Sequence, residues 1–210
     1  MKNVNKISIV GGPGTGKSTL AKNLGKKLNL PVYHLDQINF LENWEERDKE
    51  ERDNIILEKV KENKWIIDGT YKKTLKERIK NADLVIFLNY SKLARLKGIL
   101  SRYKNNKNKE RFEIPGCEEK MELSFVKFTL SWEKTNKNFV KEILEKYNNK
   151  EILIFKNRKK LNKWYEKEFG EKIEIYENWH KFFNLFLSTK RKRELWNFRS
   201  LSFFFYGSNL

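Results

Sequence analysis

Short apolar runs alternate along the chain with longer charged stretches in which apolar residues recur at helical spacing. Five runs predict β-strands, at residues 7–10, 32–35, 65–67, 84–88 and 152–155. Leu20, Leu24 and Leu28 mark one face of a helix after the first run, and the charged segment 45–64 predicts a surface helix. Strands that alternate with helices are typical of a parallel sheet covered on both faces. The pattern therefore predicts an α/β protein with three layers, α/β/α.

The pattern changes after the fourth predicted strand. A helix that Ser91 could cap is expected to run through Tyr103, and a polar stretch at 104–113 interrupts its periodicity. We therefore expect a helical lid at about residues 101–122. One or two helices within 121–147 lead back to the fifth strand.

The composition changes again after Gly170. We expect one main domain over residues 1–170, followed at 171–210 by an extension in which many aromatic residues accompany the basic run 190–193. Three roles for the extension stay open. It could cover an edge of the core, mediate a dimer, or contact nucleic acid.

Charge and cysteine content narrow the functional classes. The formal net charge of +17 suggests an anionic partner such as DNA, but the lysines are spread along the chain, so a solvated lysine-rich surface explains it equally directly. Cys117 is the single cysteine and there are two histidines, which argues against a disulfide or a zinc site and favours a cytoplasmic protein. We expect no contact with a membrane, because no stretch of about 18 apolar residues and no secretion signal is present.

The turn after the first strand carries the chemical signal with the highest specificity. It reads Gly11-Gly12-Pro13-Gly14-Thr15-Gly16-Lys17-Ser18-Thr19. This sequence fits the phosphate-binding loop (P-loop) G-x-x-x-x-G-K-[ST], set between a strand and a helix. Backbone N–H groups and the helix N-terminus would bind the phosphates of ATP or GTP, Lys17 would contact the β and γ phosphates, and Thr19 would lie near the α phosphate. Ser18 would be a ligand of Mg²⁺.

Two aspartates follow strands that should end at the same edge of the sheet. Asp68 follows the strand 65–67 and is the expected second partner of Mg²⁺, although it could also be a turn residue before Gly69. Asp36 follows the strand 32–35 and could orient an acceptor hydroxyl or act as a general base. The alternative for Asp36 is that it caps a short helix.

A family resemblance rests on four segments taken together. They are the P-loop, Tyr-His-Leu-Asp at 33–36, Trp-Ile-Ile-Asp-Gly-Thr-Tyr at 65–71 and Ala-Asp-Leu-Val-Ile-Phe-Leu at 82–88. With them, residues 1–169 resemble the DNA topology modulation protein family, a branch of adenylate-kinase-like P-loop proteins. The resemblance implies a five-stranded parallel sheet in the order 2-3-1-4-5, ATP on the P-loop, and a lid helix that carries arginines.

The sequence departs from related nucleotide kinases at two places. Those kinases usually have Pro-Arg shortly after Asp-Gly, whereas this chain has residues 70–73 as Thr-Tyr-Lys-Lys, and Gly98 stands where a basic lid residue is expected. We assign the lid cation to Arg102 and an acceptor-side contact to Arg78, because a guanidinium neutralises charge on a transferring phosphoryl group. Surface charge is the alternative explanation for each arginine.

Two functions follow from these features. The first is a small-molecule or nucleotide kinase that uses MgATP, with Lys17, Asp36, Asp68, Arg78 and Arg102 as its catalytic residues and an unidentified small acceptor. The second is a nucleotide-gated DNA-binding protein that affects DNA topology, which the net charge and the basic extension favour. The sequence favours the kinase, since it contains no helix-turn-helix, zinc-finger or RNA-recognition motif.

Overall fold

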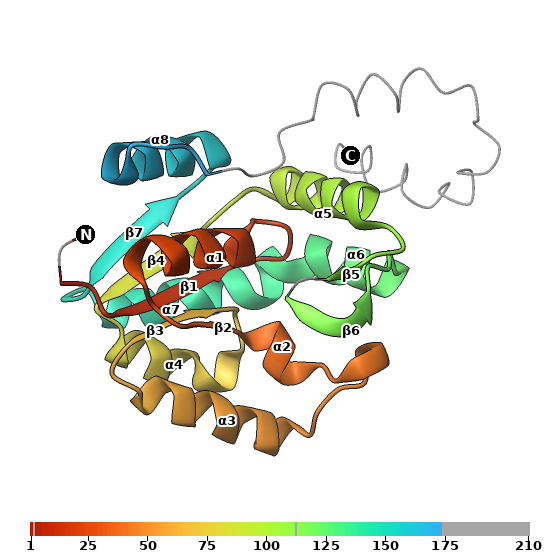
Figure 1. The fold of residues 1–210 in the computed structure, drawn as a ribbon, viewed down its shortest axis with the longest axis horizontal. Helices are drawn as coiled ribbons and strands as arrows, with labels where there is room; N and C mark the ends of the chain where they lie inside the picture. Colours follow the sequence, from red (N-terminus) through yellow and green to blue (C-terminus); the bar gives the residue numbers. More distant parts are fainter. Residues whose placement is uncertain (2, 112, 174–210) are drawn as a thin grey trace, which may run out of the picture. The chain divides into compact units, whose positions relative to one another are not determined.

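Five parallel strands form the central sheet of the computed structural model, which describes residues 1, 3–111 and 113–173. The strands are β1 (Lys6–Gly11), β2 (Val32–His34), β3 (Trp65–Asp68), β4 (Leu84–Leu88) and β7 (Glu151–Phe155). Their order is β2-β3-β1-β4-β7 (Figure 1). β7 is the fifth strand of this sheet, because β5 and β6 form a separate hairpin, so the predicted order 2-3-1-4-5 is confirmed.

Helices cover both faces of the sheet, as the alternation of strands and helices predicts. The helices are α1 (Lys17–Leu28), α2 (Leu35–Asn39), α3 (Lys49–Lys61), α4 (Lys72–Asn81), α5 (Lys92–Asn106), α6 (Leu123–Trp132), α7 (Asn138–Lys146) and α8 (Arg158–Phe169). A 3₁₀ turn, η1 (Glu42–Trp44), follows α2, and a π-helical segment, η2 (Glu133–Lys137), joins α6 to α7.

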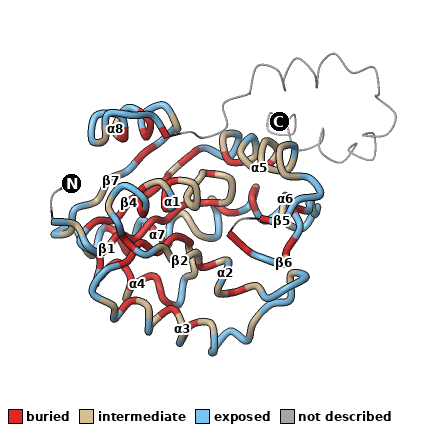
Figure 2. Tube along the Cα trace, viewed as in Figure 1, coloured by how far each residue is buried: buried red, intermediate tan, exposed pale blue. Residues whose placement is uncertain are grey.

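The core consists of two apolar clusters, one on each face of the sheet. In β4, alternate residues belong to opposite clusters, since successive strand side chains point to opposite faces. Leu20 and Leu24 of α1 pack in the first cluster with Leu161 and Tyr165 of α8. α3, α4, α6 and α7 supply helix side chains to the second. Figure 2 shows the resulting buried strands between partly exposed helices.

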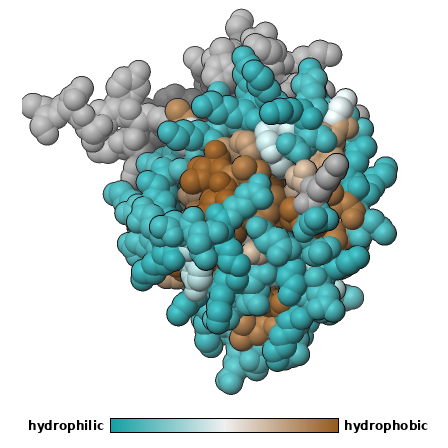
Figure 3. All heavy atoms as spheres, turned by 90° about the vertical axis from the view of Figure 1, so that its left-hand side faces the viewer, coloured by the Kyte–Doolittle hydropathy of each residue, from teal (hydrophilic) through white to brown (hydrophobic). Residues whose placement is uncertain are grey.

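The edge strand β7 is less covered than the other strands. Ile154 leaves 52% of its surface exposed, and Figure 3, which views the side where β7 lies, shows an apolar patch among polar side chains. Within the described ranges, no helix combines the length and apolarity needed to cross a bilayer.

The predicted lid segment is helical only as far as Asn106. Beyond it, β5 (Glu110–Arg111) and β6 (Ile114–Glu118) pair as an antiparallel hairpin. The expectation of a helical lid over 101–122 is therefore wrong for the hairpin. The predicted extension at 171–210 lies outside the described residues from 174 onward, so its proposed roles stay predictions.

Candidate functional site

The P-loop joins β1 to α1 at the carboxyl edge of the sheet. Gly14 and Gly16 have φ angles of 72° and 86°, a left-handed conformation that glycine adopts without steric cost. Gly16 is also the N-cap residue of α1, so the positive end of the helix dipole and its first N–H groups lie at the loop. This backbone geometry is the one that binds phosphate.

Lys17 is partly buried at the start of α1. Its Nζ donates a hydrogen bond to the carbonyl oxygen of Gly12 (3.1 Å). Burial lowers the pKa of Lys17, the charges of Asp36 and Asp68 oppose this effect, and the charge of Arg102 adds to it. Three of the predicted site residues thus act electrostatically on Lys17.

The carboxylate of Asp68 is the meeting point of the P-loop and the sheet edge. The side chain is almost fully buried, and its Oδ2 accepts a hydrogen bond from Ser18 Oγ at 2.9 Å. A serine hydroxyl beside a carboxylate is a donor set of hard oxygens, which fits Mg²⁺. The geometry brings the two predicted metal ligands together, while the assignment of the metal itself stays a prediction.

His34 is a site residue that the sequence analysis did not select. Its Nδ1 contacts Asp68 Oδ1, and β2 and β3 pair in a register that sets the two residues side by side. Burial lowers the pKa of His34, but the hydrogen bond to Asp68 and the charges of Asp68, Glu113 and Asp36 outweigh it and raise the pKa overall. The signal in the sequence was the position of His34 at a strand end.

Asp36 lies in the first turn of α2, next to the loop that follows β3. Tyr71 Oη donates a hydrogen bond to Asp36 Oδ1 at 3.1 Å. Burial, the charge of Asp36 and this hydrogen bond raise the pKa of Tyr71, so the phenol stays protonated. His34, not Asp36, is the N-cap residue of α2. The geometry therefore leaves the Asp36 carboxylate at the site edge, where the general-base prediction needs it.

Arg78 occupies a different environment from the one predicted. Its guanidinium is completely buried and donates hydrogen bonds to the carbonyl oxygens of Gly69 (3.0 Å) and Tyr71 (3.1 Å). Burial lowers its pKa to about 9, against the raising effect of Asp68 and Tyr71. These contacts correct the predicted acceptor-side role: Arg78 holds the backbone after β3 in place.

Arg102 lies near the end of α5, where the sequence analysis expected a lid cation. Its Nε forms an ion pair with Glu119 Oε2 at 2.9 Å, and its guanidinium lies over the ring of Phe125. Arg95, which lies earlier in α5, packs against Gly12 and Gly14 of the P-loop. A Cβ atom on Gly12 would lie 2.4 Å from Arg95 Cδ, so this glycine is needed for the close approach.

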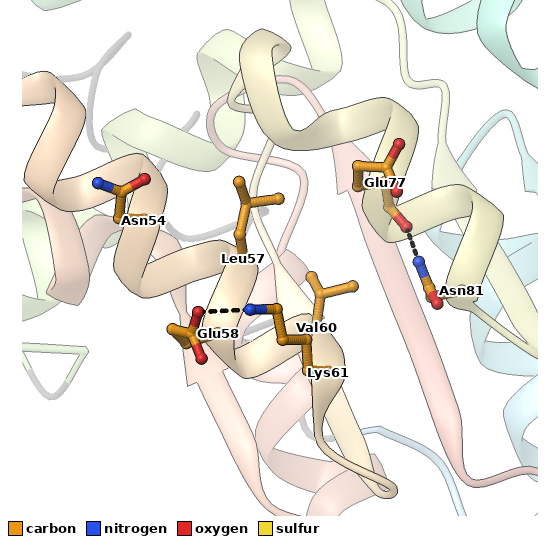
Figure 4. Close-up of a pocket in the computed structure, with 7 residues that line it drawn as sticks. All are labelled: Asn54, Leu57, Glu58, Val60, Lys61, Glu77 and Asn81. Carbon is orange, nitrogen blue, oxygen red and sulfur yellow. Dashed lines mark hydrogen bonds and ion pairs between the residues drawn. The ribbon is translucent and has the colours of Figure 1, made fainter.

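A shallow pocket between α3 and α4 contains none of the predicted site residues. Asn54 and Leu57 line it from α3, and Glu77 and Asn81 line it from α4 (Figure 4). Its dashed contacts are local ones within a single helix, such as Asn81 Nδ2 to the Glu77 carbonyl oxygen. We find no constellation for catalysis there, and the P-loop edge remains the candidate site.

One comparison with known proteins covers the P-loop and the strands β1 to β4. A family model described as AAA domain matches residues 7–122, which run from β1 through β6. No curated protein matches the chain.

Solved structures of shikimate kinases are similar to this chain at low sequence identity. The enzyme from Acinetobacter baumannii, in complex with shikimate, has a TM-score of 0.49 and 17% identity over 91% of this chain and 97% of its own. Those from Aquifex aeolicus and Bacteroides thetaiotaomicron both have a TM-score of 0.43, with 16% identity over 79% of this chain and 99% of that one, and 19% over 73% and 86%.

The family model covers more than half of the chain and includes the complete strand-loop-helix unit that carries the P-loop. This chain therefore belongs to the AAA domain family, with its nucleotide-binding P-loop between β1 and α1.

Proposed function

We propose that this chain is a phosphotransferase that uses MgATP to phosphorylate a small acceptor. The observation that carries the proposal is the hydrogen bond between Ser18 and Asp68. It joins the hydroxyl of the P-loop to the carboxylate at the end of β3, and these are the two oxygen ligands that would hold Mg²⁺. The charge of Asp68 also acts on Lys17 and raises its pKa against the effect of burial.

Each side chain would have a separate task. The P-loop backbone and Lys17 bind the phosphates, and Asp36 accepts the proton of the acceptor hydroxyl. Bound magnesium would supply positive charge to the phosphate oxygens. Arg102, which is largely buried, stabilises negative charge on the transferring group more strongly than an exposed arginine would.

Replacement of Lys17 by alanine tests the nucleotide site. We expect MgATP or MgGTP to raise the melting temperature of the wild-type chain, and Lys17→Ala to lose this shift because the phosphate charge is no longer balanced. Lys26→Ala, an exposed lysine on the same helix, is the matched control. An unchanged shift in Lys17→Ala would refute the site assignment.

An ADP-release assay over nucleosides, nucleotides, sugars and small acids tests the reaction itself. DNA is included because residues 1–169 resemble the DNA topology modulation proteins and the net charge is +17. The AAA domain match adds no support for a DNA function. Salt-dependent DNA binding without phosphate transfer to any acceptor would replace the kinase proposal by the nucleotide-gated DNA-binding function.

A further inference from the structure

Two arginines from different elements share one buried carboxylate next to the candidate site. Arg102 of α5 and Arg111 of β5 lie 2.9 Å and 3.5 Å from Glu119 Oε2, measured from each Nε. Glu119 has a side-chain exposure of 2%. Arg111 is also 3.7 Å from Glu113. Two positive and two negative charges balance, which is how a protein can keep two guanidinium groups buried.

The pairing of Arg111 is incomplete. Its residue exposure is 8%, and within the described part of the chain its buried Nε has no hydrogen-bond partner. Within the same described residues, Oε2 of Glu119 is also buried and accepts no hydrogen bond. A buried donor without an acceptor costs free energy, so this position is suited to an oxyanion that can approach more closely than Glu119 does.

Contacts with the loop after α2 fix the position of Arg111. Its guanidinium lies over the ring of Trp44, 5.3 Å from the centroid. Trp44 Nε1 donates a hydrogen bond to the Glu118 carbonyl oxygen (2.9 Å), and Trp44 N donates to Cys117 Sγ (3.2 Å). Cys117 Sγ in turn donates to the carbonyl oxygen of Leu41. The hairpin is therefore tied to the segment that directly follows the helix carrying the proposed general base.

The arginine pair also acts on the phosphate-binding centre. The positive charges of Arg102 and Arg111 both lower the pKa of Lys17, and the charge of Glu113 raises that of His34. α5, which carries Arg102, also packs against the P-loop, where a Cβ atom on Gly98 would meet the Gly14 carbonyl oxygen. The pair itself is held by α5 and the hairpin. In the proposed reaction we infer that this position is the acceptor side.

We propose that Arg102 and Arg111 form a binding site for an anionic group of the acceptor, a carboxylate or a phosphate, and that the Glu119 carboxylate holds this site until the acceptor displaces it. Only the identification of the anion as part of the acceptor rests on the proposed function. The anion site itself does not. A planar guanidinium presents paired N–H donors that match either oxyanion.

Anion binding tests the site without any turnover. The full chain is saturated with MgADP to fill the P-loop, and orthophosphate and acetate are titrated separately by calorimetry. We expect Glu119→Gln to bind one of them at least tenfold more tightly than the wild-type chain, because a competing negative charge is removed. Arg111→Gln should lose this binding. Glu118→Gln, at the exposed neighbouring position, is the matched control and should behave as wild type.

Melting temperatures show whether each variant is folded. If Arg111→Gln is unfolded, Arg111→Lys keeps the charge, loses the planar fork and should still weaken anion binding. Equal anion affinities in wild type and Glu119→Gln would overturn the proposal. So would an Arg111 variant that is folded and binds the anion as tightly as wild type.

Paired acceptors distinguish the two sources of the anion. ADP release is compared for gluconate and glucose, and for thymidine monophosphate and thymidine. We expect the charged member of one pair to be preferred at least tenfold, and Arg111→Gln to raise its KM but not that of its neutral partner. Equal use of both members contradicts the inference. No ADP release with any acceptor contradicts the phosphotransferase function instead, and the anion titration still decides the arginine site.

Discussion

The Asp68 carboxylate has one oxygen on the P-loop side and one on the β2 side. Ser18 donates to Oδ2 and His34 contacts Oδ1. An amide in this place keeps the shape of the side chain but removes its negative charge. Asp68→Asn should therefore lower magnesium-dependent turnover by roughly 10- to 100-fold, with a smaller effect on metal-free nucleotide binding.

Steady-state rates at several magnesium concentrations, with nucleotide binding followed by calorimetry, measure this effect. Asp83→Asn is the matched control. Asp83 Oδ2 accepts hydrogen bonds from the backbone N–H groups of Asn5 and Lys6, at the start of β1 and away from the P-loop. Turnover of Asp68→Asn at the wild-type level would exclude Asp68 as a metal partner.

His34→Gln addresses the orientation of this carboxylate. His34 contacts the Asp68 oxygen that Ser18 does not use. Its loss should therefore weaken magnesium binding, as Asp68→Asn does, and raise the magnesium concentration needed for half-maximal activity by about tenfold. The measurement is the magnesium concentration that gives half-maximal activity. A normal magnesium titration in a folded His34→Gln protein would show that the contact is only structural.

At this scale the sequence was informative where a residue's position alone decides its role. The proximity of Ser18 and Asp68 could be predicted because one belongs to a fixed motif and the other ends a strand, and their role as metal ligands stays a prediction. His34 and Arg78 could not be assigned correctly, since their partners depend on strand register and on how deeply a helix face is buried. Neither property is visible in a local pattern.

Among the elements, α5 packs directly against the backbone of the P-loop. A Cβ atom on Gly98 would lie 1.8 Å from the Gly14 carbonyl oxygen. This explains why glycine stands where a basic lid residue was expected: no larger residue fits without displacing the helix. The resemblance pointed to the right element, but only the packing shows this restriction.

Gly98→Ala should therefore separate α5 from the P-loop and reduce the nucleotide-dependent rise in melting temperature. Leu93→Ala on the same helix is the control, because Leu93 is 55% exposed and its truncation creates no clash. Thermal unfolding with and without MgATP measures both variants. A full nucleotide shift in Gly98→Ala would mean that the contact is not needed for binding.

The N-terminus of α3 gives a prediction about pH. Asp48 caps this helix, and hydrogen bonds from the backbone N–H groups of Glu51 and Glu50 lower its pKa. A lowered carboxyl pKa contributes stability above the unfolded-state pKa, near 4, and this contribution is lost as the pH falls through the lowered value. Asp48→Ala should melt below wild type at pH 7, with a smaller difference at pH 3.

Melting temperatures at the two pH values provide the check, with Glu58→Gln on the exposed face of the same helix as control. A difference that stays constant from pH 7 to pH 3 would be inconsistent with a charge-dependent cap.

Element prediction succeeded for the sheet and failed for the hairpin. All five sheet strands are mainly apolar runs, and three of them, β1, β3 and β4, are buried or largely buried, so composition alone marks them. β5 and β6 are short, include Pro115 and Gly116, and are positioned by contacts with the distant Trp44. A contact with a residue 74 positions away in the sequence leaves no local periodicity.

At the scale of the whole molecule, the core clusters found among the described residues extend as far as Ile173. A chain of residues 1–173 should therefore fold and show the same MgATP-dependent thermal shift as the full chain. Residues 174–210 contain six Lys or Arg and three Asp or Glu, so they supply only +3 of the net +17. Any DNA binding should accordingly persist in large part after their removal, and gel shifts at several salt concentrations measure it.

The stacking of Arg111 on Trp44 has an optical consequence. The indole of Trp44 is held between a guanidinium and the carbonyl oxygen of Glu118. Any separation of the hairpin from the loop would expose this indole to water and shift its emission to longer wavelength. With its other tryptophans replaced by phenylalanine, the molecule would report each separation of the hairpin from this loop as a change of fluorescence.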